Sequence, residues 1–289
     1  MQEMVYEALT NKISEKVTEL KIIPPVAFKI IQLISNERTT MNEFENLIGF
    51  DPVLTARLIR HVNSPIYNLK EKVGSISRAS FFVGLKDLRT IACSALRHIY
   101  QNEIMENIFL KRKLWLHSTS VGLCAQLIYK RILSYEGEDG LVAGLVHDIG
   151  LIVVTQIIEE TFKGDIIDYK KGFSSIFESQ EDMIDDTHCL IGEYIARQCS
   201  FPENIVQVIR DHHRPSTDII NLKDLYEIVL VAHHIVKHLG FVEVPEIVEK
   251  GNENIVDHFE TYKNDYRLLI KELVSEIQKP MSFYEVSRR

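Results

Sequence analysis

Along most of the chain, apolar residues recur at spacings of three and four positions, which is the period of an amphipathic α-helix. The first stripe comprises Met4, Leu9, Ile13, Val17 and Leu20. It ends before Pro24 and Pro25, since proline removes a backbone donor and clashes with the preceding turn. A short second helix is expected over residues 26–35. Helix therefore follows helix with short breaks, and the pattern predicts an all-α protein.

Capping residues mark where later helices begin. Thr40 and Glu43 have the capping-box arrangement, so a helix is expected from there to about residue 48. Asp51 is a good N-cap and Pro52 suits the first turn of the next helix, which should stop at residues 63–65. Further helices are expected over residues 75–83, 85–99, 112–133, 141–148, 151–158, 187–198, 202–213, 222–239 and 265–278. The segment 151–158 also has a strand-like composition, but no second candidate strand exists to pair with it.

The stretch from Leu141 to Gly150 carries the first candidate chemistry. Its apolar run delivers His147 and Asp148 side by side and then ends at glycine. His117 shares a helical stripe with apolar residues, so its side chain should point toward the core. The full set of candidate metal ligands is His117, His147, Asp148, His188, His212, His213 and His233. A mixed His and Asp set on packed helices suits Fe, Mn or Zn; the alternative is that each histidine is a core residue hydrogen-bonded to a neighbour.

Composition narrows the class of protein. A formal net charge of -8 and a pI near 5.8 argue against a nucleic-acid-binding surface. We find no uninterrupted apolar run of the kind that a signal peptide or a membrane span requires, so we expect a cytoplasmic protein that does not insert into membranes. The four cysteines are Cys93, Cys124, Cys189 and Cys199. They lack Cys-x-x-Cys spacing, so we interpret them as reduced core residues without a chemical role.

The histidine set resembles a known family. His117 followed by the pair His147 and Asp148 is similar to the HD superfamily of metal-dependent phosphohydrolases. The N-terminal half resembles something narrower, the HDOD (HD-related output domain) family of bacterial signalling proteins. The matching stretches are Ile23-Pro24-Pro25, Asp51-Pro52 with Leu54 and Arg57, Val62-Asn63-Ser64-Pro65 with Tyr67, Ser75-Ile76, and Val83-Gly84-Leu85 with Leu88-Arg89. The resemblance covers roughly residues 20–240.

The resemblance implies an all-helical HDOD-type bundle in three parts. These are an N-terminal helical subdomain over residues 1–105, an HD-like subdomain over 106–243 and a C-terminal helical extension over 244–289. It also implies a signalling module that binds other proteins, whose identity the sequence leaves open along with the oligomeric state. We place candidate partner contacts at Arg57, Asn63, Tyr67 and Arg89.

Departures from the catalytic members of the superfamily favour a regulatory role. His233 occupies the place of the closing aspartate, and Leu151 occupies the place of a lysine that HD-GYP phosphodiesterases use. The paired histidines are followed by Arg214 and Pro215 instead of a glutamate and a Gly-Tyr-Pro loop. We therefore favour a non-catalytic regulatory module with a degenerate HD-type site. The alternative is a metal-dependent phosphohydrolase that acts on a cyclic dinucleotide or a nucleotide.

Overall fold

The computed structural model describes residue 33 and residues 38–96, 108–162, 184–214, 220–241, 258–259 and 262–286. Within these ranges the regular elements are helices and none is a strand, so the all-α prediction is confirmed. The predicted first helix lies outside the described residues, as does the predicted second helix except for Leu33. Within the same ranges, no helix combines the length and the apolar character needed to cross a membrane.

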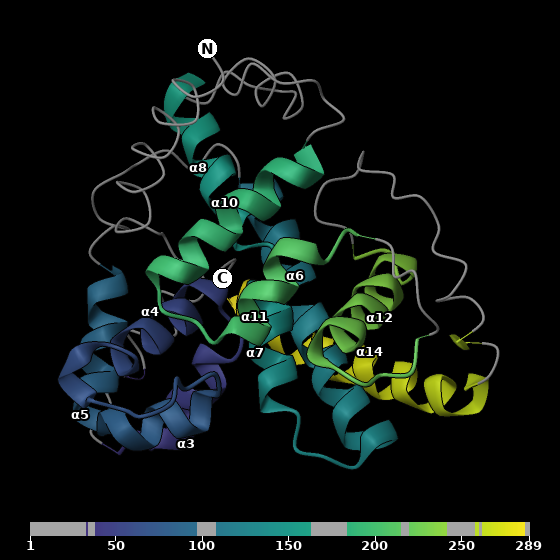
Figure 1. Cartoon of the computed structure of the whole chain (residues 1–289), viewed down its shortest axis with the longest axis horizontal. Helices are drawn as coiled ribbons and strands as arrows, with labels where there is room; N and C mark the ends of the chain where they lie inside the picture. The colour runs from purple at the N-terminus through teal and green to yellow at the C-terminus, as the bar shows by residue number, and fades with distance from the viewer. Residues whose placement is uncertain are drawn as a thin grey trace.

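Three helices, α3 (Met41–Ile48), α4 (Pro52–Val62) and α5 (Ile76–Leu96), pack together at the lower left of Figure 1. The predicted caps are confirmed. Thr40 and Glu43 form a capping box at the start of α3, and the Asp51 side chain accepts a 2.8 Å hydrogen bond from the Leu54 backbone N–H. The predicted break at Gly84 is also confirmed, because Gly84 has φ 77° and ψ 161° and divides α5 into two helical pieces.

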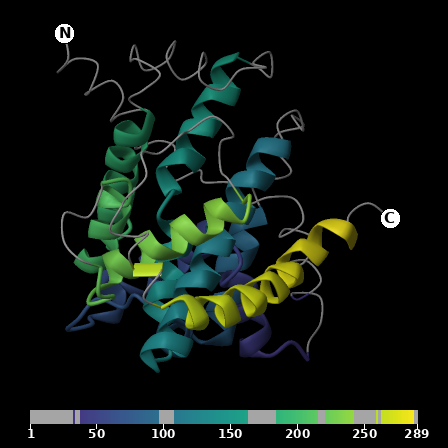
Figure 2. The same cartoon turned by 90° about the vertical axis from the view of Figure 1, so that its right-hand side faces the viewer.

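The centre of the molecule is α6 (Ile108–Ile128), which packs against α7 (Glu138–Val146), α12 (Leu225–His238) and α14 (Lys263–Val286). Figure 2 shows α14, in yellow, crossing the face of this group. Helices α6 and α7 approach closely because glycines meet at their contact: a Cβ on Gly144 would lie 2.6 Å from the Cα of Gly122. No larger side chain fits between these two backbones.

Several of the predicted boundaries differ from the observed ones. Helix α6 begins at Ile108, four residues before the predicted start, and a π-helical turn, η2 (Tyr129–Leu133), completes it. Helix α12 begins later than predicted, because the Asp224 side chain accepts from the Glu227 N–H and fixes the N-terminus there. Helix α14 starts before the predicted position and extends beyond the predicted end.

The predicted break between the helices 141–148 and 151–158 lies two residues earlier than expected. The chain turns at residues 147–148, and a new helix, α8 (Ile149–Phe162), begins at once and contains Gly150. Helix α8 packs against α10 (Ile184–Gln198), and the two lie together in the upper part of Figure 1. A Cβ on Gly150 would lie 2.0 Å from the backbone O of His188, so this glycine permits a close helix contact rather than ending a helix.

Side chains tie the N-terminal helices to the rest of the molecule. The Asn63 amide group donates to the backbone O of Val73 and of Ser200, at 2.9 and 3.1 Å. Lys72 Nζ donates to the backbone O of Phe201, and Trp115 Nε1 on α6 donates to the backbone O of Phe50. These bonds, together with the packing of α4 against α7, fix the N-terminal helices beside α6, α7 and α11 (Glu203–Asp211).

Candidate metal centre

Five segments bring the predicted ligands to one place in the interior. His117 lies in the middle of α6, His147 and Asp148 form the turn between α7 and α8, and His188 lies on α10. His212 and His213 follow the last residue of α11, and His233 lies on α12. All the candidate ligands are at most 1% exposed except His213, which is half-buried. The structure therefore assembles a buried polar cluster from residues as far apart in sequence as α6 and α12.

Backbone carbonyls orient the rings of three of these histidines. The Nδ1 atom lies 2.6 Å from O of Phe241 in His117, 2.7 Å from O of Gly144 in His147 and 2.9 Å from O of Ile209 in His212. A carbonyl oxygen only accepts hydrogen bonds, so the proton of each neutral ring is on Nδ1 and the lone pair is on Nε2. Metal-ligating histidines are commonly held in this way by a partner at the other ring nitrogen.

His117, His147 and His233 form what we call the first ligand group. Their candidate ligand atoms lie within 4.8 Å of one another, and the Nε2 atoms of His117 and His147 are 3.3 Å apart. With the proton on Nδ1 in both rings, two lone pairs face each other across this distance. Such an arrangement is repulsive unless a proton or a metal cation lies between the nitrogens.

His188, Cys189, His212 and His213 form the second ligand group, again with ligand atoms within 4.8 Å of one another. The Nε2 of His188 lies 3.3 Å from the Nε2 of His212, 3.2 Å from the Nε2 of His213 and 3.7 Å from the Sγ of Cys189. The sequence pattern predicts no chemical role for Cys189. Its position next to His188 in the chain is the one sequence feature from which a role as a ligand could have been predicted.

Asp148 connects the two groups. Its Oδ1 lies 3.1 Å from the Nε2 of His212 and 3.4 Å from the Nε2 of His188. Its Oδ2 faces the first group, 3.2 Å from the Nε2 of His147 and 3.6 Å from the Nε2 of His117, without the geometry of a hydrogen bond. A buried carboxylate oxygen that lies among imidazole nitrogens and makes no hydrogen bond fits a metal ion, because a cation is the partner that both atom types would share.

The two groups differ in their proton affinity. Burial lowers the pKa of His147, and burial together with the neighbouring imidazoles lowers the pKa of His233 well below its usual value. In the second group, burial acts in the same direction but is outweighed by the negative charges of Cys189 and Asp148, which raise the pKa of His188 to about 10. Without metal, these shifts favour the neutral forms of His147 and His233, whereas His188 in the second group binds a proton that a metal would displace.

The acidic members show the complementary shifts. Burial acts to raise the pKa of Asp148, but the surrounding imidazoles, His147 foremost, lower it well below its usual value. Burial likewise opposes ionisation of Cys189, yet His212 and His188 bring the pKa of its thiol down to about 6. The cluster therefore carries a carboxylate and a thiolate at neutral pH.

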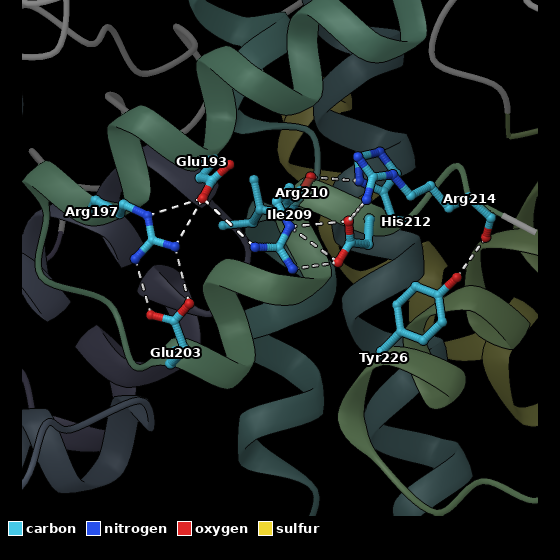
Figure 3. Close-up of polar contacts among 9 residues, drawn as sticks. Glu193, Arg197, Glu203, Ile209, Arg210, His212, Arg214 and Tyr226 are labelled. Carbon is cyan, nitrogen blue, oxygen red and sulfur yellow. Dashed lines mark hydrogen bonds and ion pairs between the residues drawn. The ribbon is translucent and has the colours of Figure 1, made fainter. Parts of the chain in front are cut away.

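Figure 3 shows polar contacts of Arg210, Arg214 and Tyr226 near His212, at the turn that follows α11. The Asp211 carboxylate accepts from Arg210 Nη2 at 2.7 Å and pairs with Arg214 Nη1 at 2.9 Å. The Tyr226 hydroxyl on α12 donates to the backbone O of Arg214 at 2.5 Å. These contacts connect α11 to α12 beside the second ligand group.

The predicted partner contacts have mixed environments. Arg57 and Asn63 are half-buried, and the Asn63 amide is engaged with backbone groups as described above. The half-buried ring of Tyr67 contacts His61 edge to face, with centroids 5.4 Å apart. Arg89 lies in α5, but its side chain is outside the described part of the structure. The apolar residues most exposed in this region are Ile66 and Phe81, at 84% and 80%, and sequence periodicity did not single them out.

The family comparison agrees with this architecture. A model of the HDOD domain family matches residues 20–215. An uncharacterized protein of Treponema pallidum (strain Nichols) is 24% identical over 238 residues, which make up 80% of this chain and 45% of that protein. The chain thus spans less than half the length of that relative.

Two solved structures share the fold. The crystal structure of the MmoQ response regulator from Methylococcus capsulatus str. Bath has a TM-score of 0.61 at 19% identity, over 76% of this chain and 86% of that chain. A virulence factor from Campylobacter jejuni subsp. jejuni has a TM-score of 0.55 at 13% identity, over 78% and 81% of the two chains. At such identities the likeness concerns the fold alone.

Proposed function

Because the chain belongs to the HDOD family, we propose that it is a regulatory signalling module that binds other proteins and whose HD-like site holds metal without catalysing hydrolysis. The name of MmoQ, a response regulator with the same fold, is consistent with a signalling role. The metal would be held by His117, His147, Asp148, His188, His212, His213 and His233. Bound there, a cation would supply positive charge among the converging lone pairs and connect the helices that carry them.

The enclosure of the ligands is the observation that carries the non-catalytic assignment. A catalytic metal site keeps a position open for water or substrate, whereas a structural site is closed by protein ligands. Here all the candidate ligands except His213 are at most 1% exposed. Leu151, which stands where related phosphodiesterases have a lysine, is buried too and offers no charge to a phosphate.

Metal content and hydrolysis test this assignment together. Protein purified without chelator, or loaded anaerobically with Fe, Mn or Zn, should contain metal and unfold at a higher temperature than the chelated protein. His147→Ala should lose bound metal, because it removes a ligand from the first group. His258→Ala is the matched control: His258 is also buried, but its ring nitrogens contact Ile220 O and Tyr266 Oη outside the cluster, so this variant should keep the metal.

The same preparations should not hydrolyse cyclic di-GMP at ordinary enzyme rates. Protein that stays metal-free after loading would contradict the metal assignment. Turnover on the order of one per second or faster, lost in Asp148→Ala, would contradict the non-catalytic assignment.

A metal-dependent phosphohydrolase is the second candidate, and one observation favours it. The two oxygens of Asp148 face different ligand groups, and a carboxylate between two metal ions is a feature that two-metal hydrolases use to align an attacking oxygen. The hydrolysis assay above separates the two candidates, with a nucleotide and a cyclic dinucleotide as substrates.

Partner binding is assigned to the N-terminal helices. Aromatic residues and arginines anchor many protein interfaces, and Tyr67 and Arg89 have the suitable residue types there. Affinity capture from native cell extract should recover fewer partners with Tyr67→Ala and Arg89→Ala combined than with the wild type. Tyr135→Ala is a suitable control, since Tyr135 is an exposed aromatic residue outside these helices. Equal recovery by all folded variants would contradict this location of the surface.

A further inference from the structure

We propose that Cys189 is itself a metal ligand and that the second ligand group is a mixed thiolate and imidazole site that prefers Zn(II) to Mn(II). The inference rests on the proposed metal-holding role and makes it specific, because the four-residue group would then differ in chemistry from the all-imidazole first group. Two sites of unequal metal preference would share one carboxylate, that of Asp148.

The spacing of the atoms supports a tetrahedral site. Zinc bonds of about 2.0–2.1 Å to nitrogen and about 2.3 Å to sulfur imply tetrahedral edges of roughly 3.3 Å between nitrogens and roughly 3.6 Å between nitrogen and sulfur. The Nε2 of His188 lies 3.3 and 3.2 Å from the Nε2 atoms of His212 and His213. It lies 3.7 Å from the Sγ of Cys189. All three distances match the edges that such a site would have.

Cys189 differs from the other described cysteines in its surroundings. Cys124 and Cys199 are buried as Cys189 is, but among the described residues Cys189 is the cysteine that groups with histidines at metal-ligand spacing. Its Sγ lies within 4 Å of both the His188 Nε2 and the His212 Nδ1, at 3.7 and 3.8 Å. Core packing alone would be satisfied by apolar neighbours, as it is for most buried cysteines.

The placement of the ligands explains what a metal here would do to the fold. His188 and Cys189 come from α10, whereas His212 and His213 come from the turn after α11. A metal in the second group would therefore connect these two helices, which already pack against each other. Soft thiolate ligands select zinc, iron or copper over magnesium, calcium and manganese, so the cysteine would set the preference of this site.

Cobalt substitution provides the direct test. Chelated full-length protein is titrated anaerobically with Co(II), and wild type should develop a thiolate-to-cobalt charge-transfer absorption in the near ultraviolet. Cys189→Ser should still bind Co(II) through the remaining ligands but lose this absorption. Its Zn(II) affinity in the second group should fall by at least about tenfold, since even outer partners of a ligand are worth about 10–100-fold. Its Mn(II) affinity should change less.

Cys199→Ser is the matched control and should retain the charge-transfer absorption. Because a variant can fail to fold, X-ray absorption of the zinc-loaded wild type is a second measurement, in which a sulfur neighbour at about 2.3 Å is expected. Cobalt bound with only nitrogen and oxygen neighbours would overturn the role of Cys189 and leave the proposed metal-holding function standing. A wild type that binds neither Co(II) nor Zn(II) would overturn both.

Discussion

The N-terminal helices and the histidine cluster each bury one aspartate, and the two carboxyl groups have opposite electrostatic surroundings. Asp51 and Asp148 are both 1% exposed. Asp51 caps α4, and burial raises its pKa to about 6 even though the Leu54 N–H and Arg57 favour the charged form. Asp148 lies among imidazoles that hold its pKa well below the usual value.

This difference shows why burial alone does not identify a functional residue. The carboxyl group of Asp51 binds the backbone, because one of its oxygens accepts a hydrogen bond from the N–H of Leu54. At Asp148 the partners are ring nitrogens from α6, the α7–α8 turn, α10 and the turn after α11, and one oxygen makes no hydrogen bond. A helix cap needs no cation, whereas a buried carboxylate oxygen that faces ring nitrogens and makes no hydrogen bond fits one.

The comparison predicts opposite effects for the same substitution. In chelated protein at pH 7, Asp148→Asn should lower the free energy of unfolding by about 3–5 kcal/mol, because it removes the anion from a buried charged network. Asp51→Asn should leave stability unchanged or raise it, since asparagine also caps helices and carries no charge to bury. Urea denaturation of the two variants and the wild type measures both effects.

The metal content of the same two variants provides a second test of the difference between Asp148 and Asp51. Asp148→Asn should reduce the metal bound by both ligand groups, and Asp51→Asn should not change it. Equal losses of stability, or equal metal content, would show that the two aspartates do not differ as their surroundings indicate.

A second prediction concerns the pH dependence of stability at Asp51. In the unfolded chain its carboxyl group titrates near 3.8, and in the folded protein near 6. The folded state therefore binds the proton more tightly, so the contribution of Asp51 to stability is full below pH 4 and is lost as pH rises through 6. This difference in the pKa of Asp51 corresponds to a loss of about 3 kcal/mol in the free energy of unfolding.

Asp51→Asn supplies the measurement. The difference in unfolding free energy between wild type and variant should fall by that amount between about pH 4 and pH 7. The pH response of the histidine cluster is common to both proteins and cancels in the difference. A flat difference curve would mean that Asp51 is ionised in the folded state across this whole range.

Much of the fold could be predicted from residues that lie near one another in the sequence. The capping pair Thr40 and Glu43, the cap at Asp51 and the break at Gly84 depend on residues near one another in sequence, and each lies where the sequence predicts it. The inward position of His117 followed from the apolar stripe on its helix, and His117 is fully buried. Elements defined by neighbouring residues were predictable for this reason.

What depends on docking between helices was not predictable. The division of the ligands into two groups around Asp148 depends on how α8 meets α10 and how α7 meets α11 and α12, which periodicity does not describe. A cysteine on an apolar stripe has the same pattern whether leucine or histidine packs against it, so Cys189 was missed. Gly150 ends the apolar run in the sequence, and its close backbone contact with α10 does not follow from that pattern.

The last prediction compares two glycines, one from each region. Gly150→Ala places a methyl group against backbone atoms of His188 and Gly192, so α8 and α10 must separate at a cost of about 1–3 kcal/mol. Gly84→Ala meets no atom within 4 Å, but φ 77° strains any other residue, which also costs about 1–3 kcal/mol. Calorimetry should therefore find similar destabilisation of the two variants.

The affinity for metal should differ between the two variants. Gly150→Ala displaces His188 and weakens binding in the second ligand group, whereas Gly84→Ala leaves binding intact. If both variants bind Zn(II) as the wild type does, the α8–α10 contact does not position His188 for metal.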